Sequence, residues 1–187
     1  MTHRQITDPN VQILAGIATM LEPDYVPESD PWKGSPFAWI QTRPSRQKGA
    51  IGEALVSGWA AAKGCDVKKS PNSDADKIIN GHRIEIKYSN LWTNNQIFKF
   101  QQIRNQDYDY VFCLGLSPFD AQAWFIPKAV LMGDLPEGVT PQHGGSAGTD
   151  TRWLSFPAAQ PPHWMDPFGG RMQKAYERLL EAGHGPY

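Results

Sequence analysis

Two aspartates, a glutamate and two lysines lie close together in the segment DADKIINGHRIEIK, residues 74 to 87. The Asn80-Gly81 pair in the middle of this segment is the strongest short-range signal for a two-residue β-hairpin turn of type I′. In the register that this turn sets, Asp76 lies directly opposite Glu85 on the neighbouring strand. The sequence therefore predicts a hairpin that brings two carboxylates together.

Strand alternation places the charged and the apolar side chains of this hairpin on opposite faces. Opposed carboxylates repel each other unless a cation lies between them. Oxygen donors with no nearby cysteine or paired histidine favour Mg²⁺ or Mn²⁺ over Zn²⁺. An ammonium on the same face can position a water or stabilise charge on a phosphate. An edge hairpin whose charges only keep it soluble is the alternative. The charged face holds Asp74, Asp76, Arg83, Glu85 and Lys87, and the apolar face holds Ala75, Ile79, Ile84 and Ile86.

The rest of the chain predicts helices and strands that would position the hairpin. Apolar spacing predicts helices over 10–22, 45–63 and 171–182, and the second of these ends at a glycine and carries a single acidic residue, Glu53. Short apolar runs predict strands at 65–70, 108–116, 121–127 and 151–156. The segment 22–39, with four prolines, is typical of an extended connector, and 133–167 is rich in glycine, proline and histidine.

Length and composition are those of one globular domain. The chain has 187 residues, of which 40% are hydrophobic and 20% charged. A formal net charge of -1 excludes binding to nucleic acid by bulk charge, but it leaves room for a local basic face. Two cysteines, Cys65 and Cys113, are too few for a disulfide framework or a cysteine-rich zinc site. No apolar run is long enough to span a bilayer and no signal peptide is evident, so we expect a cytoplasmic protein.

Two stretches, GAIGEALV at 49–56 and SDADKIINGHRIEIKYS at 73–89, together resemble the PD-(D/E)XK nuclease superfamily, which includes type II restriction endonucleases. Glu53 matches the helix acid of that family, Asp76 the strand aspartate, and Glu85-Ile86-Lys87 the acid-x-Lys triplet. The sequence departs from the family where Ala75-Asp76 replaces the Pro-Asp dipeptide. Asp74 is therefore a further candidate for the aspartate, although only Asp76 faces Glu85.

The resemblance covers about residues 45–127 and implies a fold. It implies an α/β protein with a restriction-endonuclease-like core, a central mixed β-sheet flanked by helices. We expect a single nuclease domain over 1–187, with the catalytic core at about 45–127, an N-terminal helix and a C-terminal loop-helix extension.

The resemblance also implies metal-dependent hydrolysis of phosphodiester bonds. Mg²⁺, which Mn²⁺ would replace, would be held by Asp76, Glu85 and the backbone carbonyl of Ile86. Glu53 would bind a second metal or a water, and Lys87 would position the attacking water. We expect a sequence-specific type II restriction-type endonuclease that acts as a homodimer on double-stranded DNA. The alternatives are a structure-specific repair, junction-resolving or phage nuclease of the same fold, and a nucleic-acid-binding module without activity.

Contacts to DNA are expected in three basic or amide-rich stretches. Polar and aromatic residues interleave at 88–106, directly after the strand that ends with Lys87, and basic residues precede both the Glu53 helix and the hairpin. Amides suit adenine edges, arginine suits guanine, and lysine suits phosphate. An ordinary solvent-exposed role is open for each residue singly. The candidates are Arg43, Arg46, Lys48, Lys69, Asn94, Asn95, Gln96, Lys99, Gln101, Gln102 and Arg104, with His143 in a glycine-rich loop as a further candidate.

Overall fold

The computed structural model of the chain describes residues 7–25, 30–142 and 151–182. The chain divides into two compact units, Met1–Lys33 and Gly34–Tyr187. The first unit contains α1 (Pro9–Tyr25), which confirms the predicted helix at 10–22. The single domain over 1–187 stays a prediction. Within the described residues, no helix is both long and apolar enough to cross a membrane.

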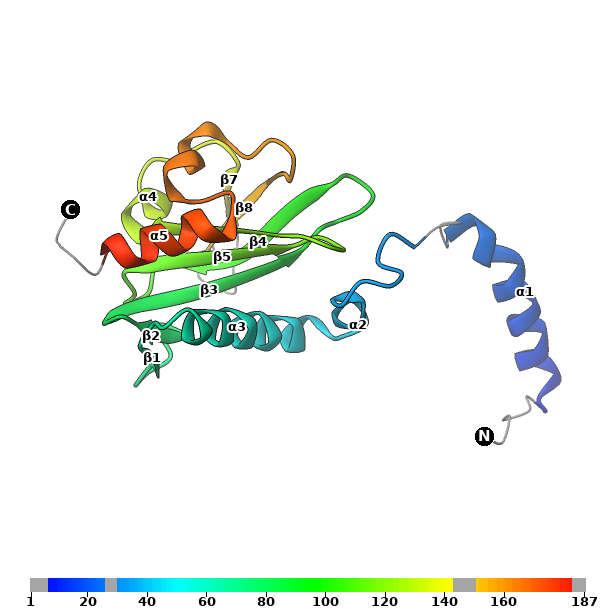
Figure 1. Ribbon diagram of the computed structural model, residues 1–187. Coiled ribbons are helices and arrows are strands. Elements are labelled where there is room, and N and C mark those ends of the chain that lie inside the picture. The colour runs from blue at the N-terminus through cyan, green and yellow to red at the C-terminus, as the bar shows by residue number, and fades with distance from the viewer. Residues whose placement is uncertain (1–6, 26–29, 143–150, 183–187) are drawn as a thin grey trace. The chain divides into compact units, whose positions relative to one another are not determined.

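The centre of the second unit is a five-stranded mixed sheet with strand order β1-β2-β3-β5-β6. β3 and β5 run parallel, and the other neighbouring pairs are antiparallel. Helices flank this sheet (Figure 1), so the predicted α/β class with a central mixed sheet is confirmed. The strands are β1 (Val67–Lys69), β2 (Lys77–Ile79), β3 (His82–Asn90), β5 (Tyr110–Leu116) and β6 (Ala121–Pro127).

The hairpin of β2 and β3 forms as predicted. Asn80 and Gly81 have φ angles of 50° and 87°, the left-handed conformation that both central residues of a type I′ turn require. Ile79 pairs with His82, as the turn predicts. The local chemistry of two residues therefore sets the register of the strands that carry the candidate site.

Two helices cover one face of the mixed sheet: α3 (Ser45–Ala62) packs on β3, and α5 (Met172–Ala182) packs on β6. Gly52 of α3 lies so close to Tyr88 of β3 that a Cβ at Gly52 would be 2.4 Å from the Tyr88 Cβ. Further along α3, the ring of Trp59 lies 5.6 Å from that of Phe112 and 6.0 Å from that of Tyr176. These contacts fix the position of α3 above the strand that bears the predicted catalytic residues.

A second sheet, with strand order β4-β8-β7, covers the other face. Its inner side chains form an aromatic core with the mixed sheet, in which the ring of Trp124 lies 5.1 Å from Phe156 and 6.3 Å from Phe98. Only β8 of this sheet had been predicted. The strands are β4 (Ile97–Arg104), β7 (Val139–Gln142) and β8 (Thr151–Pro157), and the remaining short helices are α2 (Ala38–Gln41), α4 (Lys128–Met132) and the 3₁₀ helix η2 (His163–Phe168).

Candidate active site

The predicted catalytic residues lie around the point where β2 leaves β3. The ladder between the two strands runs only from Lys77↔Ile84 to the turn, whereas β3 continues to Asn90. Among the residues that the structure describes, no strand pairs with the β2 side of β3 from Glu85 onward. α3 packs against β3, which brings a helix carboxylate to the same part of the sheet.

Asp76 is bonded to β3 on both sides of Glu85. The backbone N–H of Asp76 donates to the carbonyl of Ile84 at 3.0 Å, and the N–H of Ile86 donates to Oδ2 of Asp76 at 2.7 Å. The side chain of Asp76 thus takes the place of a strand partner at the point where the ladder stops. Because the N–H and C=O of one strand residue point to the same edge, the carbonyl of Ile86 also faces this edge.

Glu85 and Lys87 form an ion pair in a largely covered position. Nζ of Lys87 lies 2.6 Å from Oε1 of Glu85. The side chain of Lys87 is 16% exposed and that of Glu85 is 9% exposed. Glu85 pairs with Val111 and Lys87 with Cys113 on β5, so both lie on the face that the second sheet covers. This corrects the expectation that one face of the hairpin is core and the other only charged, because both faces are covered here.

Arg83, which strand alternation also places on the charged face, is engaged elsewhere. Its guanidinium pairs with Asp109, with Nη2 2.9 Å from Oδ1, and also contacts Asp107. The side-chain hydrogen bonds from Arg83 hold the pKa of Asp109 below its usual value although burial acts in the other direction. Arg83 therefore anchors the start of β3 to the segment before β5.

Glu53 reaches the site from the helix. It follows Gly52, the residue of α3 packed on Tyr88, and its Oε2 lies 3.8 Å from Nζ of Lys77. Sequence reasoning missed Lys77. The signal was present, because Lys77 follows Asp76 directly and the register places it opposite Ile84.

The pKa values of two carboxylates of the site, Glu53 and Glu85, are raised above the ordinary value. Burial is the main cause that raises the pKa of Glu85 above its ordinary 4.5; Asp76 and Glu53 raise it further, and Lys87 counteracts them. The pKa of Glu53 is raised too, first by burial and then by Asp76, while Lys77 and Lys87 lower it. Each of these acids would ionise more readily if a cation were added.

The donor types fit a hard divalent cation: carboxylate oxygens and a strand carbonyl, with no cysteine or histidine among them. Within the described part of the chain, however, no three His, Cys, Asp or Glu side chains lie close enough together to form a ready-made metal site. At Glu85, Oε1 is already paired with Nζ of Lys87. A cation would therefore compete with the Lys87 ammonium for this carboxylate.

Asp74 and His143 are the two further candidates that the sequence suggested for the site. Asp74 lies in the turn before β2, where its backbone N–H donates to Oδ1 of Asn72 at 3.2 Å. The bonds to β3 are made by Asp76, as the register predicts. His143 lies outside the described residues.

The predicted DNA-contact residues fall into three places. Lys69 lies in β1, and the basic residues of 43–48 lie just before α3 and in its first turn. Within the turn before β4, the amide of Gln96 donates to the carbonyl of Thr93 at 2.9 Å, so this side chain supports the turn. The predicted contact residues in the turn before β4 are Asn94, Asn95 and Gln96, and the predicted contact residues on β4 are Lys99, Gln101, Gln102 and Arg104.

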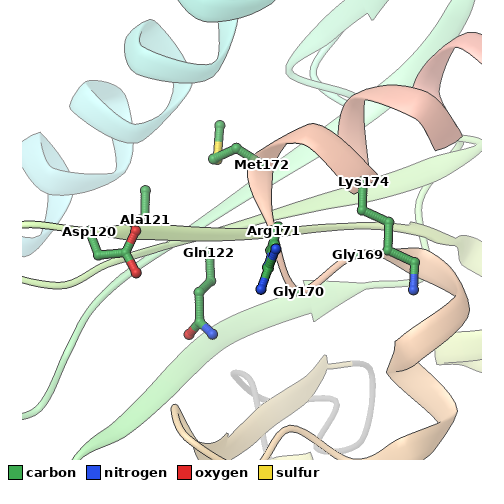
Figure 2. A pocket seen from close by; sticks show the side chains of 8 residues that line it. All are labelled: Asp120, Ala121, Gln122, Gly169, Gly170, Arg171, Met172 and Lys174. Atoms are coloured by element: carbon green, nitrogen blue, oxygen red, sulfur yellow. Dashed lines mark hydrogen bonds between the residues drawn. The ribbon is translucent and has the colours of Figure 1, made fainter.

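A pocket of about 620 Å³ lies apart from these acids. It is formed where β6 begins and the chain enters α5, and Figure 2 shows the side chains that line it. None of the four predicted catalytic residues contributes to it. Its lining residues are Asp120, Ala121, Gln122, Gly169, Gly170, Arg171, Met172 and Lys174.

Comparisons with known proteins do not assign an activity to this protein. No protein-family model and no curated protein matches the chain. A solved structure of a bacterial homing endonuclease aligns with a TM-score of 0.47 and 15% sequence identity, over 75% of this chain and 94% of that chain. A likeness of this size carries no argument about activity, which is inferred below from the residues alone.

Proposed function

We propose that this protein is a metal-dependent DNA endonuclease. The observation that carries the proposal is the meeting of Asp76, Glu85 and Lys87 at the unpaired edge of β3, with Glu53 brought close by α3. Burial and mutual repulsion raise the pKa values of Glu53 and Glu85, an arrangement that costs stability unless a cation is bound. Such a cluster is typical of a site built for metal-assisted phosphoryl chemistry.

Each residue has a role in this proposal. Asp76, Glu85 and the carbonyl of Ile86 would hold the ion, which we take to be Mg²⁺ with Mn²⁺ as a substitute. When bound, the ion polarises the phosphate and lowers the pKa of a water. Lys87, released from Glu85, directs its ammonium to the attacking water or to the charge that builds on the phosphate. Glu53 orients a water or a second ion.

The finer proposal is a sequence-specific, restriction-type enzyme that acts as a homodimer on duplex DNA. It rests on the motif resemblance and on the amide-rich strand β4 beside the site. A structure-specific nuclease with the same four residues is the alternative within the same chemistry. A binding module without activity is disfavoured, because such a module gains nothing from keeping repelling carboxylates buried together.

Cleavage of supercoiled plasmid and of phage DNA tests the proposal. The parent protein is incubated with Mg²⁺, Mn²⁺ or EDTA, beside Glu85→Gln and Lys87→Met. Glu137→Gln is a matched control, since Glu137 is exposed and lies in the turn before β7. We expect discrete fragments from the parent and the control with metal, and intact DNA with EDTA or with either site variant. Cleavage by Glu85→Gln at the parental rate would refute the assignment of the site. Intact DNA with the parent protein in every metal would refute the proposed nuclease activity.

A further inference from the structure

The charged residues in the strands of the second sheet are all basic. The strands β4, β7 and β8 contain Lys99, Arg104 and Arg152 and no aspartate or glutamate. Arg152 is engaged with the end of α4, where Nη1 donates to the carbonyls of Leu131 and Gly133 at 2.5 and 2.8 Å. Lys99 and Arg104 therefore supply positive charge to this sheet in a chain whose formal net charge is -1.

The second sheet contacts β3 through β4, its edge strand on that side. The backbone N–H of Lys99 donates to Oγ of Ser89 at 2.9 Å, and Ser89 lies two residues beyond Lys87 on the same face of β3. β4 therefore begins beside the strand that bears the catalytic residues.

Lys99 is held between two indole rings. Its Nζ lies 4.3 Å from the ring centroid of Trp153 and 5.4 Å from that of Trp92. Trp153 is on β8 and Trp92 in the turn before β4, and Trp92 is 50% exposed. Cation–π contacts of this kind restrict a flexible lysine, so the ammonium is presented from a defined position.

A β-bulge places two glutamines next to each other on β4. The register between β4 and β8 shifts between Phe100 and Ile103, both of which are fully buried on the inner side. The two residues between them, Gln101 and Gln102, are exposed, and Gln102 has a φ of 56°. Left-handed backbone is uncommon for glutamine. Bulges re-aim side chains, and here the bulge directs two amides away from the core.

We propose that the outer face of the second sheet, defined by Lys99, Gln101, Gln102 and Arg104, reads bases in the major groove of the duplex that is cut, with the two glutamines contacting adenine. The inference rests on the proposed function and names the recognition element of the same site. The major groove admits a β-ribbon, and a glutamine amide makes two hydrogen bonds with adenine. Lys99 and Arg104 supply the charge that phosphates attract.

Selection of binding sites from randomised duplexes in EDTA tests this inference without cleavage. The variant is Gln101→Ala with Gln102→Gly, since glycine adopts the φ of 56° readily. Gln173→Ala is the matched control, because Gln173 is an exposed glutamine on α5. This helix packs on the face of the mixed sheet that the second sheet does not cover. We expect the parent and the control to enrich sites with adenine at defined positions. The variant should lose about tenfold or more of that preference and keep its affinity for random DNA.

The outcomes separate the two proposals. An unchanged preference in the double variant, or an equal loss of affinity for every sequence, would overturn base reading by this face. A changed oligomeric state with unchanged selected sites would show instead that the face binds a second copy of the chain, which also overturns it. A parent that selects sites and does not cut with metal would refute the nuclease and leave the reading face standing. A parent that binds no duplex refutes both.

Discussion

The backbone N–H of Ile86 donates to Oδ2 of Asp76 at 2.7 Å, at the point where β2 stops pairing with β3. One carboxylate oxygen therefore completes the strand edge, and the other is left for the site. The bond also places Asp76 beside Glu85, whose neighbours on β3 are the two residues that Asp76 contacts. In the proposed function Asp76 has a structural and a catalytic role, and substitutions can separate the two.

Asp76→Asn should abolish activity and keep the fold. Asparagine retains an oxygen that accepts the Ile86 N–H, but it lacks the charge that a divalent ion requires. We expect cleavage to fall about 100-fold or more and the melting temperature to stay close to that of the parent. Asp74→Asn serves as the matched control, and its activity should match that of the parent. If Asp74→Asn were inactive and Asp76→Asn active, the roles of the two aspartates would be exchanged.

Asp76→Ala should be less stable than Asp76→Asn. Alanine leaves the N–H of Ile86 without its acceptor, which costs about 1 to 3 kcal/mol when the group is buried. Urea denaturation of the two variants measures the difference. Equal stability of the two would mean that this hydrogen bond contributes little to the strand edge.

Divalent metal should stabilise the protein in the absence of DNA. At a concentration 100 times its dissociation constant, a bound ion adds about 2.7 kcal/mol to the free energy of unfolding. Because the pKa values of Glu53 and Glu85 are raised above 4.5, protons compete with the metal, and the stabilisation should shrink as the pH falls toward 5. Thermal melts with Mg²⁺ or Mn²⁺ at pH 5 and pH 8 measure this.

Glu85→Gln separates a specific site from loose binding of metal to the surface. The variant should lose most of the metal-induced increase in melting temperature, whereas Glu137→Gln should keep it. An equal increase in both variants would place the metal elsewhere.

Lys87→Met should destabilise the protein more at pH 8 than at pH 5. The folded-state pKa of Glu85 is raised, so stability is lost as the pH rises from 4.5 through that pKa. Lys87 lowers this pKa, and its removal would leave Glu85 ionised and unpaired in a covered position at high pH. We expect a loss of about 3 kcal/mol at pH 8, measured by urea denaturation.

The double variant Glu85→Gln with Lys87→Met isolates the cause. With the carboxylate neutralised, most of the pH-dependent loss should disappear. Additive losses at pH 8 would show that the two side chains do not act as a pair.

Gly52→Ala should destabilise the protein and reduce activity. The added Cβ would come within 2.4 Å of the Tyr88 Cβ, so α3 and its next residue, Glu53, must move. We expect a loss of about 1 to 3 kcal/mol. Gly58→Ala, also in α3, has nothing within 4 Å of its Cβ and should stabilise the helix by about 0.5 to 1 kcal/mol. Equal effects of the two substitutions would argue against the close packing of α3 on β3.

The sequence by itself determined the hairpin, its register and the residues that it would bring together. A type I′ turn requires left-handed backbone at two successive positions, and Asn80 and Gly81 adopt it readily. This local preference pairs Ile79 with His82. The helix that carries Glu53 was equally evident, because its apolar spacing and the glycine at its end are local as well.

Only the tertiary structure decided what covers the hairpin and which charges pair. β4 was not predicted as a strand, because the bulge at Gln101 and Gln102 breaks the alternation that follows Phe98 and Phe100. The burial of Glu85 follows from that second sheet, and the pairs of Lys77 with Glu53 and of Arg83 with Asp109 join residues far apart in the chain. Turn chemistry acts between neighbours in sequence, whereas burial and ion pairing depend on which distant segments pack together.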